Sequence, residues 1–215
     1  ARKAELLYKS FFDFAGNTVD RPSRRMGIHY YATKEEYERN LWNSARDAGF
    51  SIHNVSGFYQ NSTRIASFHA KNQKGPEGER IGPDEQVLYH ELVHQILDLA
   101  HDAKFASRLT FLRARQNEQP CFWAIEGIAC FFETCELQGM RLVPTARNPR
   151  YARFAKGMGE GRKPGLASWI RMGQKEFMAE DQALSHYDQA AALTHFLLHY
   201  ASGQKYRRSF FLYLS

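Results

Sequence analysis

The pattern of apolar and polar residues predicts mixed structure in the first part of the chain. Segments rich in β-branched and aromatic residues predict three strands, at 26–31, 55–59 and 63–70. Thr33 is the expected N-cap of a helix that runs to about Ala48, since two glutamates occupy its first turn and Gly49 follows its end. Residues 71–83 contain three Gly and two Pro, so we expect a loop there.

Helical spacing dominates from residue 84 onward. Apolar residues recur on one face of a helix expected from Asp84 to about His101: Val87, Leu88, Leu92, Ile96 and Leu99. Further helices are expected at 103–115, 122–137, 166–172 and 184–200 and from Lys205, with a loop-rich basic stretch after 137. The predicted class is α+β, in a single domain over residues 1–215. A small N-terminal sheet unit with a helix (1–83) packs on a mainly helical half (84–215).

Composition supports an ordinary folded domain. The chain has 215 residues, of which 43% are hydrophobic and 24% charged. A chain of this length buries about 70% of its unfolded surface, so it needs no metal or disulfide to fold. No apolar run is long enough for a membrane span, and the first residues lack the apolar core of a secretory signal. Three cysteines cannot all pair, and Cys130 and Cys135 point to different sides of one expected helix. We therefore expect mainly free thiols, and the cellular location stays open.

The net charge of +6 is concentrated in one segment. Between residues 147 and 163, Glu160 is the only acid among six basic residues: Arg147, Arg150, Arg153, Lys156, Arg162 and Lys163. We interpret this segment as a solvated loop face, because basic runs commonly are. If it binds a partner, Arg147, Arg150, Arg153, Arg162 and Lys163 predict an anionic surface.

The strongest chemical signal is the sequence His90-Glu-Leu-Val-His94 within the helix expected from Asp84. Residues four apart lie on one helix face, so both imidazoles can reach a single Zn²⁺ at about 2.0–2.1 Å. Glu91 is then placed to act as general base toward a metal-bound water. The alternative to a metal site is a pair of surface histidines beside a solvated glutamate.

A catalytic zinc site needs a third protein ligand and an open position for water. His101 is excluded as the third ligand, because seven residues of continuous helix beyond His94 correspond to a rise of about 10.5 Å, which is too far for the same metal ion. By position alone, four acids compete for the third place: Glu118, Glu126, Glu133 and Glu136.

The segment from Trp123 to Glu133 resembles a gluzincin motif. Zinc metallopeptidases of this type follow the HExxH helix with Trp-x-x-Glu-Gly-x-Ala-x-Tyr-x-Glu, whose first Glu is the third ligand. This chain matches the motif at five positions and departs from it with Phe131 in place of Tyr; the matches are Trp123, Glu126, Gly127, Ala129 and Glu133. The resemblance implies that Glu126 completes a site for one zinc ion and that the substrate is a peptide or protein.

The chain also looks similar to a bacterial family of gluzincin-like domains whose substrates are generally unassigned. The likeness covers most of residues 25–214, and its weaker elements are Tyr30-Tyr31, Glu35-Glu-Tyr37, Gly57-Phe-Tyr59, Arg64-Ile65 and Ser185-His-Tyr-Asp-Gln-Ala190. It implies that Tyr187 donates a hydrogen bond to the oxyanion, against the alternative of an ordinary core tyrosine. It also implies that strand 63–70 is the edge strand that pairs with substrate, and it favours a bacterial extracytoplasmic or secreted location.

Three functions are compatible with these features. The first is a zinc metallopeptidase, a hydrolase in which Glu91 is the base. The second is a non-catalytic zinc-binding scaffold that keeps the fold, and the intact Glu91 favours the first over it. The third, a nucleic-acid-associated zinc protease, rests only on the net charge and is the least favoured. Asp98 is interpreted as helix-surface polar rather than as a residue that orients a ligand. His195 and His199 are not expected to form a second metal site, because no acid-bearing motif accompanies them.

Overall fold

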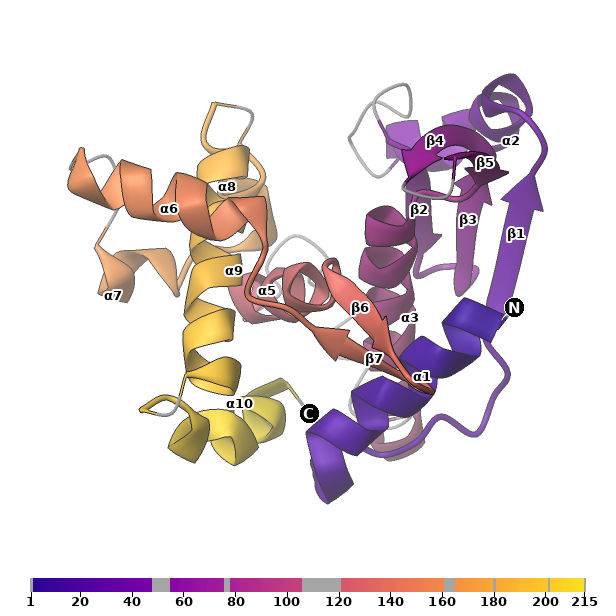
Figure 1. Cartoon of the computed structure of the whole chain (residues 1–215). Helices are drawn as coiled ribbons and strands as arrows, with labels where there is room; N and C mark the ends of the chain where they lie inside the picture. The colour runs from indigo at the N-terminus through magenta and orange to yellow at the C-terminus, as the bar shows by residue number, and fades with distance from the viewer. Residues whose placement is uncertain are drawn as a thin grey trace.

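The computed structural model describes residues 2–47, 55–75, 78–105, 121–160, 165–179, 181–200 and 202–214. Its class is α+β, as predicted: small sheets lie in the N-terminal part and the C-terminal half is mostly helical. Figure 1 shows the sheet and its helices on one side, the C-terminal helices on the other, and one buried helix between them. That helix is α5 (Phe122–Phe132), and it packs against both α3 (Glu85–Phe105) and α9 (Ala183–His199).

The main sheet has three strands in the order β1-β3-β2. The predicted strands are confirmed as β1 (Gly27–Tyr31), β2 (Gly57–Gln60) and β3 (Ile65–His69). β3 pairs in parallel with β1 and antiparallel with β2, with Tyr59 opposite Ala66. Because β3 has a neighbour on both sides, it cannot be the edge strand that pairs with substrate, and that expectation is wrong. β2 is the strand next to α3 at the sheet edge.

One of the two N-terminal helices packs on this sheet, and the other packs on α3. α2 (Lys34–Asp47) confirms the predicted helix, and Thr33 caps it because its Oγ1 accepts a hydrogen bond from the Glu36 backbone N–H at 3.1 Å. The expected end at Ala48 and Gly49 lies outside the described residues. α1 (Arg2–Ala15) was not predicted. Its apolar face lies in the core with Phe11 fully buried, and a short 3-10 turn, η1 (Gly16–Thr18), follows it.

Helix α3 carries the His-Glu-Leu-Val-His sequence and is longer than predicted. It continues through residues 103–105, the start of the expected short helix, whose remainder lies outside the described residues, as does Glu118. Gln95 is completely buried and fixes α3 to the sheet, since its Nε2 donates to the carbonyl oxygens of Gly27 and Arg64, both at 2.8 Å. The residue directly after His94 therefore helps to hold the motif in place against the sheet.

Two expected boundaries are corrected. Residues 71–83 are not a loop but contain a paired hairpin, β4 (Lys71–Gly75) with β5 (Gly78–Gly82). The helix expected at 122–137 ends at Phe132, and the chain forms a second hairpin, β6 (Cys135–Gln138) with β7 (Arg141–Pro144). Gly139 adopts a left-handed φ of 62° in its turn, a conformation that glycine accepts freely. The strands are only four or five residues long, and β4 and β5 are mostly polar, so neither hairpin was predicted from the sequence.

The basic stretch after 137 also contains a helix, α6 (Pro149–Gly159). Asn148 caps it and Pro149 occupies its first turn, which is a typical helix start that the charge pattern hid. The remaining helices confirm the predicted positions: α7 (Leu166–Trp169), α9, a 3-10 turn η3 (Gln204–Tyr206) and α10 (Arg207–Leu214), with the additional short α8 (Gln174–Phe177).

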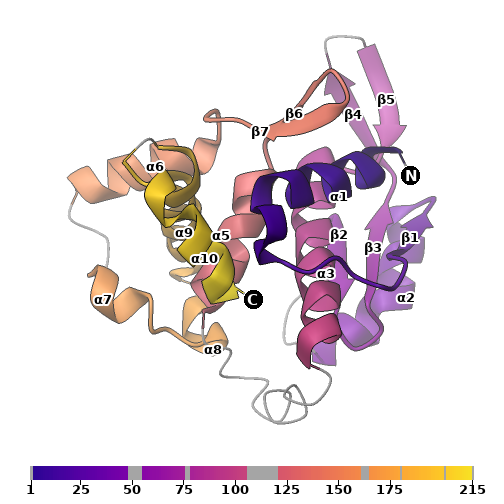
Figure 2. The same ribbon diagram turned by 90° about the horizontal axis from the view of Figure 1, so that it is seen from below.

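One core joins the two halves. α5 is buried along nearly all its length, and aromatic side chains from α1, α5 and α10 pack around Phe11. Figure 2 shows the β6–β7 hairpin beside α1, where the Leu142 backbone N–H donates to Ser10 Oγ at 2.9 Å. Among the described residues, no helix combines the length and apolar character needed to cross a membrane.

The cysteines are free, as expected: Cys121, Cys130 and Cys135. Cys135 lies on β6, so the two later cysteines do not share a helix as the sequence had suggested.

Candidate metal centre

The two histidines of α3 converge as their spacing predicts. Nε2 of His90 lies 3.0 Å from Nε2 of His94, with the ring centroids 4.7 Å apart and the rings close to perpendicular. Both side chains are largely buried, at 13% and 15% exposed. The interpretation as two unrelated surface histidines is therefore inconsistent with the structure.

Glu126 on α5 completes a triangle with them. Its Oε2 lies 3.3 Å from Nε2 of His90 and 3.4 Å from Nε2 of His94, and the residue is 6% exposed. The two other described candidates for this place are arranged differently. Glu133 faces the opposite nitrogen of His90, and Glu136 is exposed on β6 and belongs to no group of metal-binding side chains among the described residues.

The triangle has the dimensions of a metal site. Tetrahedral ligands about 2.0–2.1 Å from a zinc ion lie about 3.3 Å from one another. Glu126 Oε2 is buried and has no hydrogen-bond partner among the described residues. This carboxylate oxygen and the two imidazole nitrogens face one another at 3.0–3.4 Å. Burial raises the pKa of Glu126, but His94 and His90 outweigh it and lower the pKa below its ordinary value. An ionised Glu126 beside two imidazoles fits a divalent cation.

Glu133 orients His90 from behind. His90 Nδ1 lies 2.8 Å from Glu133 Oε1, and Arg150 donates to both Glu133 oxygens, from Nε at 2.9 Å and from Nη2 at 3.0 Å. Burial raises the pKa of Glu133, but the hydrogen bonds from His90 and Arg150 outweigh it and lower the pKa to about 2. A metal-binding histidine commonly donates its other N–H to a carboxylate in this way.

A second group of potential ligands shares His90: its Nδ1 side faces Cys130 and Glu133. This group is a poorer metal site, because the Arg150 guanidinium already occupies both Glu133 oxygens. Burial and the nearby Glu133 raise the pKa of the Cys130 thiol to about 11, which disfavours the thiolate that binds metals. The group of His90, His94 and Glu126 is therefore the candidate metal centre.

Glu91 lies between the metal centre and the sheet. Its Oε2 accepts a hydrogen bond from the Tyr59 backbone N–H of β2 at 2.8 Å, which fixes the carboxylate and leaves Oε1 outside that bond. Burial raises the pKa of Glu91 above its ordinary value and outweighs the lowering effect of His90 and His94. A carboxylate with a raised pKa beside a metal centre is suited to accept a proton and to release it.

Tyr187 of α9 lies against the same centre. Its ring centroid is 6.4 Å from that of His90, and the Arg150 guanidinium lies 5.4 Å from the tyrosine ring centroid. The hydroxyl, however, donates to Met178 Sδ at 3.3 Å rather than to a metal-centre residue. Burial, followed by the nearby Glu126, raises the pKa of Tyr187 well above its ordinary value, so the hydroxyl stays a proton donor.

Two secondary candidates have other roles. Asp98 accepts a hydrogen bond from the Tyr59 hydroxyl at 2.6 Å. This bond attaches β2 to α3, so the role of Asp98 here is to join the sheet to the helix rather than to orient a histidine. The His195 ring stacks on His199 with centroids 4.9 Å apart and lies 4.3 Å from the Tyr151 ring. Within the described part of the chain, neither histidine belongs to a group of three metal-binding side chains.

The described part of the basic segment is largely exposed, as interpreted, but it forms helix α6 rather than a loop, and the Arg150 side chain is largely buried. Arg150 binds Glu133, and Arg153 binds Asp188 through two hydrogen bonds of 2.7 and 3.0 Å. Arg147 is exposed, and Arg162 and Lys163 lie outside the described residues.

Sequence reasoning missed the roles of Glu133 and Arg150. The seven-residue spacing from Glu126 to Glu133 places both on one helix face and could have indicated the first. Nothing local connects Arg150 with His90.

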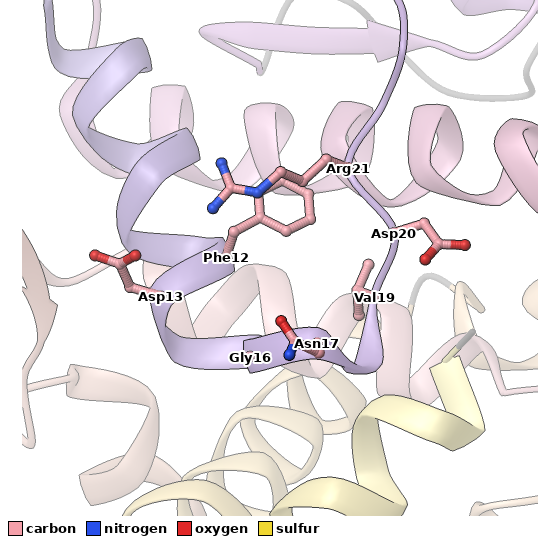
Figure 3. Close-up of a pocket in the computed structure, with 7 residues that line it drawn as sticks. All are labelled: Phe12, Asp13, Gly16, Asn17, Val19, Asp20 and Arg21. Atoms are coloured by element: carbon pink, nitrogen blue, oxygen red, sulfur yellow. The ribbon is translucent and has the colours of Figure 1, made fainter.

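A cavity of about 460 Å³ lies elsewhere, at the end of α1 (Figure 3). The Arg21 guanidinium lies 5.2 Å from the Phe12 ring centroid there. The residues that line it contribute nothing to the metal centre: Phe12, Asp13, Gly16, Asn17, Val19, Asp20 and Arg21.

The fold and the site together define an α+β protein with a two-histidine, one-carboxylate candidate metal centre. The family described as "Protein of unknown function (DUF1570)" matches residues 86–209, more than half of the chain and the segment that holds the whole centre, and the chain belongs to this family. No curated protein and no solved structure has a significant match to it.

Proposed function

We propose that the chain is a zinc-dependent metallopeptidase of the gluzincin type. The observation that carries the proposal is the convergence of His90, His94 and Glu126 at 3.0–3.4 Å beside a half-buried glutamate, Glu91. His90, His94 and Glu126 would hold the zinc. A zinc ion with three protein ligands keeps a position for water, lowers the pKa of that water to about 7 and polarises a carbonyl oxygen.

Glu91 is the general base of this proposal. The Tyr59 N–H holds Oε2, so Oε1 is the oxygen that takes the proton of the attacking water. The same oxygen then passes the proton to the departing amine of the cleaved peptide. The raised pKa of Glu91 supports this double role, because a carboxylate of higher pKa is a stronger base toward the water, and a pKa nearer neutral pH still allows the proton to pass on to the amine.

Tyr187 is proposed as the donor to the oxyanion that develops on the scissile carbonyl. In the structure its hydroxyl is bound to the Met178 thioether, which is a weak acceptor. A stronger acceptor, the developing oxyanion, would compete favourably for this hydroxyl, and the interaction gains strength in the transition state.

A non-catalytic zinc scaffold is the alternative, and Glu91 argues against it. Burial of an ionisable side chain is costly, and a structural zinc site has no need of a base. Here the base is half-buried, with a raised pKa, and is also oriented by a backbone hydrogen bond.

The test compares the wild-type chain with Glu91→Gln on a peptide library, with products read by mass spectrometry and bound zinc by elemental analysis. We expect Glu91→Gln to bind zinc as the wild type does and to lose about 10²- to 10⁴-fold in hydrolysis. Glu35→Gln, an exposed glutamate of α2, is the control and should retain full activity. Zinc binding without hydrolysis in the wild type would support the scaffold, and full activity of Glu91→Gln would refute the assigned base.

A further inference from the structure

A chain of hydrogen bonds and ion pairs leads away from the metal centre through the C-terminal half. His90 Nδ1 faces Glu133 Oε1, and the Arg150 guanidinium holds both Glu133 oxygens. Arg150 Nη1 then lies 3.8 Å from Asp188 Oδ1. Asp188 is itself held by Arg153, one helical turn beyond Arg150. The conformation of a candidate ligand is thus connected to a helix that contributes no ligand.

Arg150 is placed by the start of α6. The buried Asn148 donates from Nδ2 to the Cys130 carbonyl oxygen at 3.0 Å, which attaches the beginning of α6 to α5. Its Oδ1 accepts from the Arg150 backbone N–H at 2.9 Å. Since Cys130 lies between Glu126 and Glu133 on α5, this cap brings the Arg150 guanidinium directly onto Glu133.

The planar guanidinium of Arg150 matches the geometry of the Glu133 carboxylate. The carboxylate is 11% exposed, and His90 contacts only Oε1, which it shares with Arg150 Nη2. Arg150 Nε is the donor to Oε2. Two parallel N–H groups fix the plane of a carboxylate, whereas a lysine ammonium acts as a single point charge.

We propose that Arg150 is a positioning residue of the metal centre: it fixes the Glu133 carboxylate and thereby holds the His90 ring with Nε2 toward His94 and Glu126. This inference rests on the proposed function in one respect, the zinc that His90 would bind. The guanidinium also contacts the Tyr187 ring, so the same residue supports two side chains of the proposed mechanism.

The first experiment measures zinc affinity by competition with a chelator. We expect Arg150→Gln to weaken zinc binding about 10- to 100-fold, the usual effect of removing an outer-shell partner. Arg150→Lys should recover part of this loss. Arg153→Gln removes the same charge from the same helix without touching Glu133, and it should stay within about twofold of the wild type.

A double variant separates positioning from general destabilisation. If Arg150 acts through Glu133, then Glu133→Gln with Arg150→Gln should bind zinc no more weakly than Glu133→Gln alone. Additive losses would overturn the proposal, as would wild-type zinc affinity in a folded Arg150→Gln protein. Should Arg150→Gln not fold, the zinc affinities of Arg150→Lys and Arg153→Gln are compared. Weaker binding in Arg150→Lys supports the proposal, and equal affinities overturn it.

A metal-free measurement keeps this inference separate from the peptidase proposal. In the NMR spectrum of the apo protein, the Nδ1 proton of His90 should be protected by Glu133 and should broaden or disappear in Arg150→Gln but not in Arg153→Gln. An unchanged Nδ1 signal in Arg150→Gln overturns the positioning role whether or not the chain cleaves peptides. A lost signal in a protein without peptidase activity refutes only the proposed function.

Discussion

Gly127 of α5 and Thr194 of α9 lie so close together that no side chain fits between them. A Cβ at position 127 would overlap Thr194 Oγ1 and would lie 2.9 Å from the carbonyl oxygen of Ala190. Gly127 directly follows Glu126, so this close approach of the two helices is next to the proposed third ligand. The glycine of the motif has a packing role here, since it lets α9, which carries Tyr187, approach the helix that carries Glu126.

We therefore expect Gly127→Ala to destabilise the fold by about 1–3 kcal/mol, the usual cost of overpacking. In an open helix position the same change stabilises by up to about 1 kcal/mol. Gly159 is such a position, because a Cβ there meets nothing within 4 Å, and Gly159→Ala is the matched control. Denaturant unfolding measures both. A Gly127→Ala protein as stable as the Gly159→Ala protein would contradict the packing argument.

Loss of an outer-shell partner weakens zinc binding about 10- to 100-fold. Glu126→Gln should weaken it further, because a neutral amide replaces the only anionic ligand in the proposed set. Glu136→Gln on β6 makes the same chemical change away from the histidines and should leave zinc affinity unchanged. Chelator competition gives both affinities. Equal affinities in the two variants would remove Glu126 from the ligand set.

Tyr187→Phe should lower kcat by about 10²- to 10³-fold, the range seen when one oxyanion donor is removed, while KM and zinc affinity change little. Within the described part of the chain, the Tyr187 hydroxyl donates a hydrogen bond to Met178 Sδ, so the ground state loses a weak bond. Steady-state kinetics on a cleaved peptide measures the split between kcat and KM. An unchanged kcat would leave Tyr187 as a packing residue.

His195 makes the fold sensitive to acid. Burial, with a smaller effect from His199, lowers the pKa of His195 below its ordinary value. The unfolded chain therefore binds the proton more readily, and stability falls as the pH drops from the unfolded value of about 6.5 toward the lower folded pKa. We expect His195→Gln to show a smaller loss of stability between pH 7 and pH 5.

Urea unfolding across this pH range measures the effect. The ring lies among Tyr151, His199 and Tyr200, with no acid among these neighbours to stabilise a charged imidazole. His29→Gln on the exposed strand β1 is the control and should follow the wild-type curve. Identical pH profiles for His195→Gln and the wild type would exclude this contribution.

Local signals predicted the elements that carry the proposed ligands. The four-residue spacing of His90 and His94 is a property of any α-helix, so their convergence followed from the sequence once helix α3 was recognised. Thr33 was recognised as a cap for a similar reason, because N-capping involves residues only three apart. The free cysteines were expected from their number.

The hairpins and the first helix were not predicted. β4–β5 and β6–β7 depend on pairing between two backbones, and their strands are too short for an apolar and polar pattern to identify them. The N-terminal α1 has an apolar face that packs on α3 and β7, and it was overlooked before a partner for that face was known. The assignment of strand 63–70 as the sheet edge was wrong because strand order is a property of the whole sheet. β3 lies at the centre, between β1 and β2.

The sequence by itself determined which residues could bind a metal and which of them share a helix, since helical spacing acts over one or two turns. The choice of Glu126 over Glu133 came from a motif resemblance, and the distances to Nε2 and Nδ1 of His90 now separate the two carboxylates. Only the tertiary structure decided that Arg150 faces Glu133, that Tyr59 orients Glu91 and that the Tyr187 hydroxyl turns to Met178. Each of these contacts joins elements distant in sequence, and their geometry depends on how the helices and the sheet pack into one core.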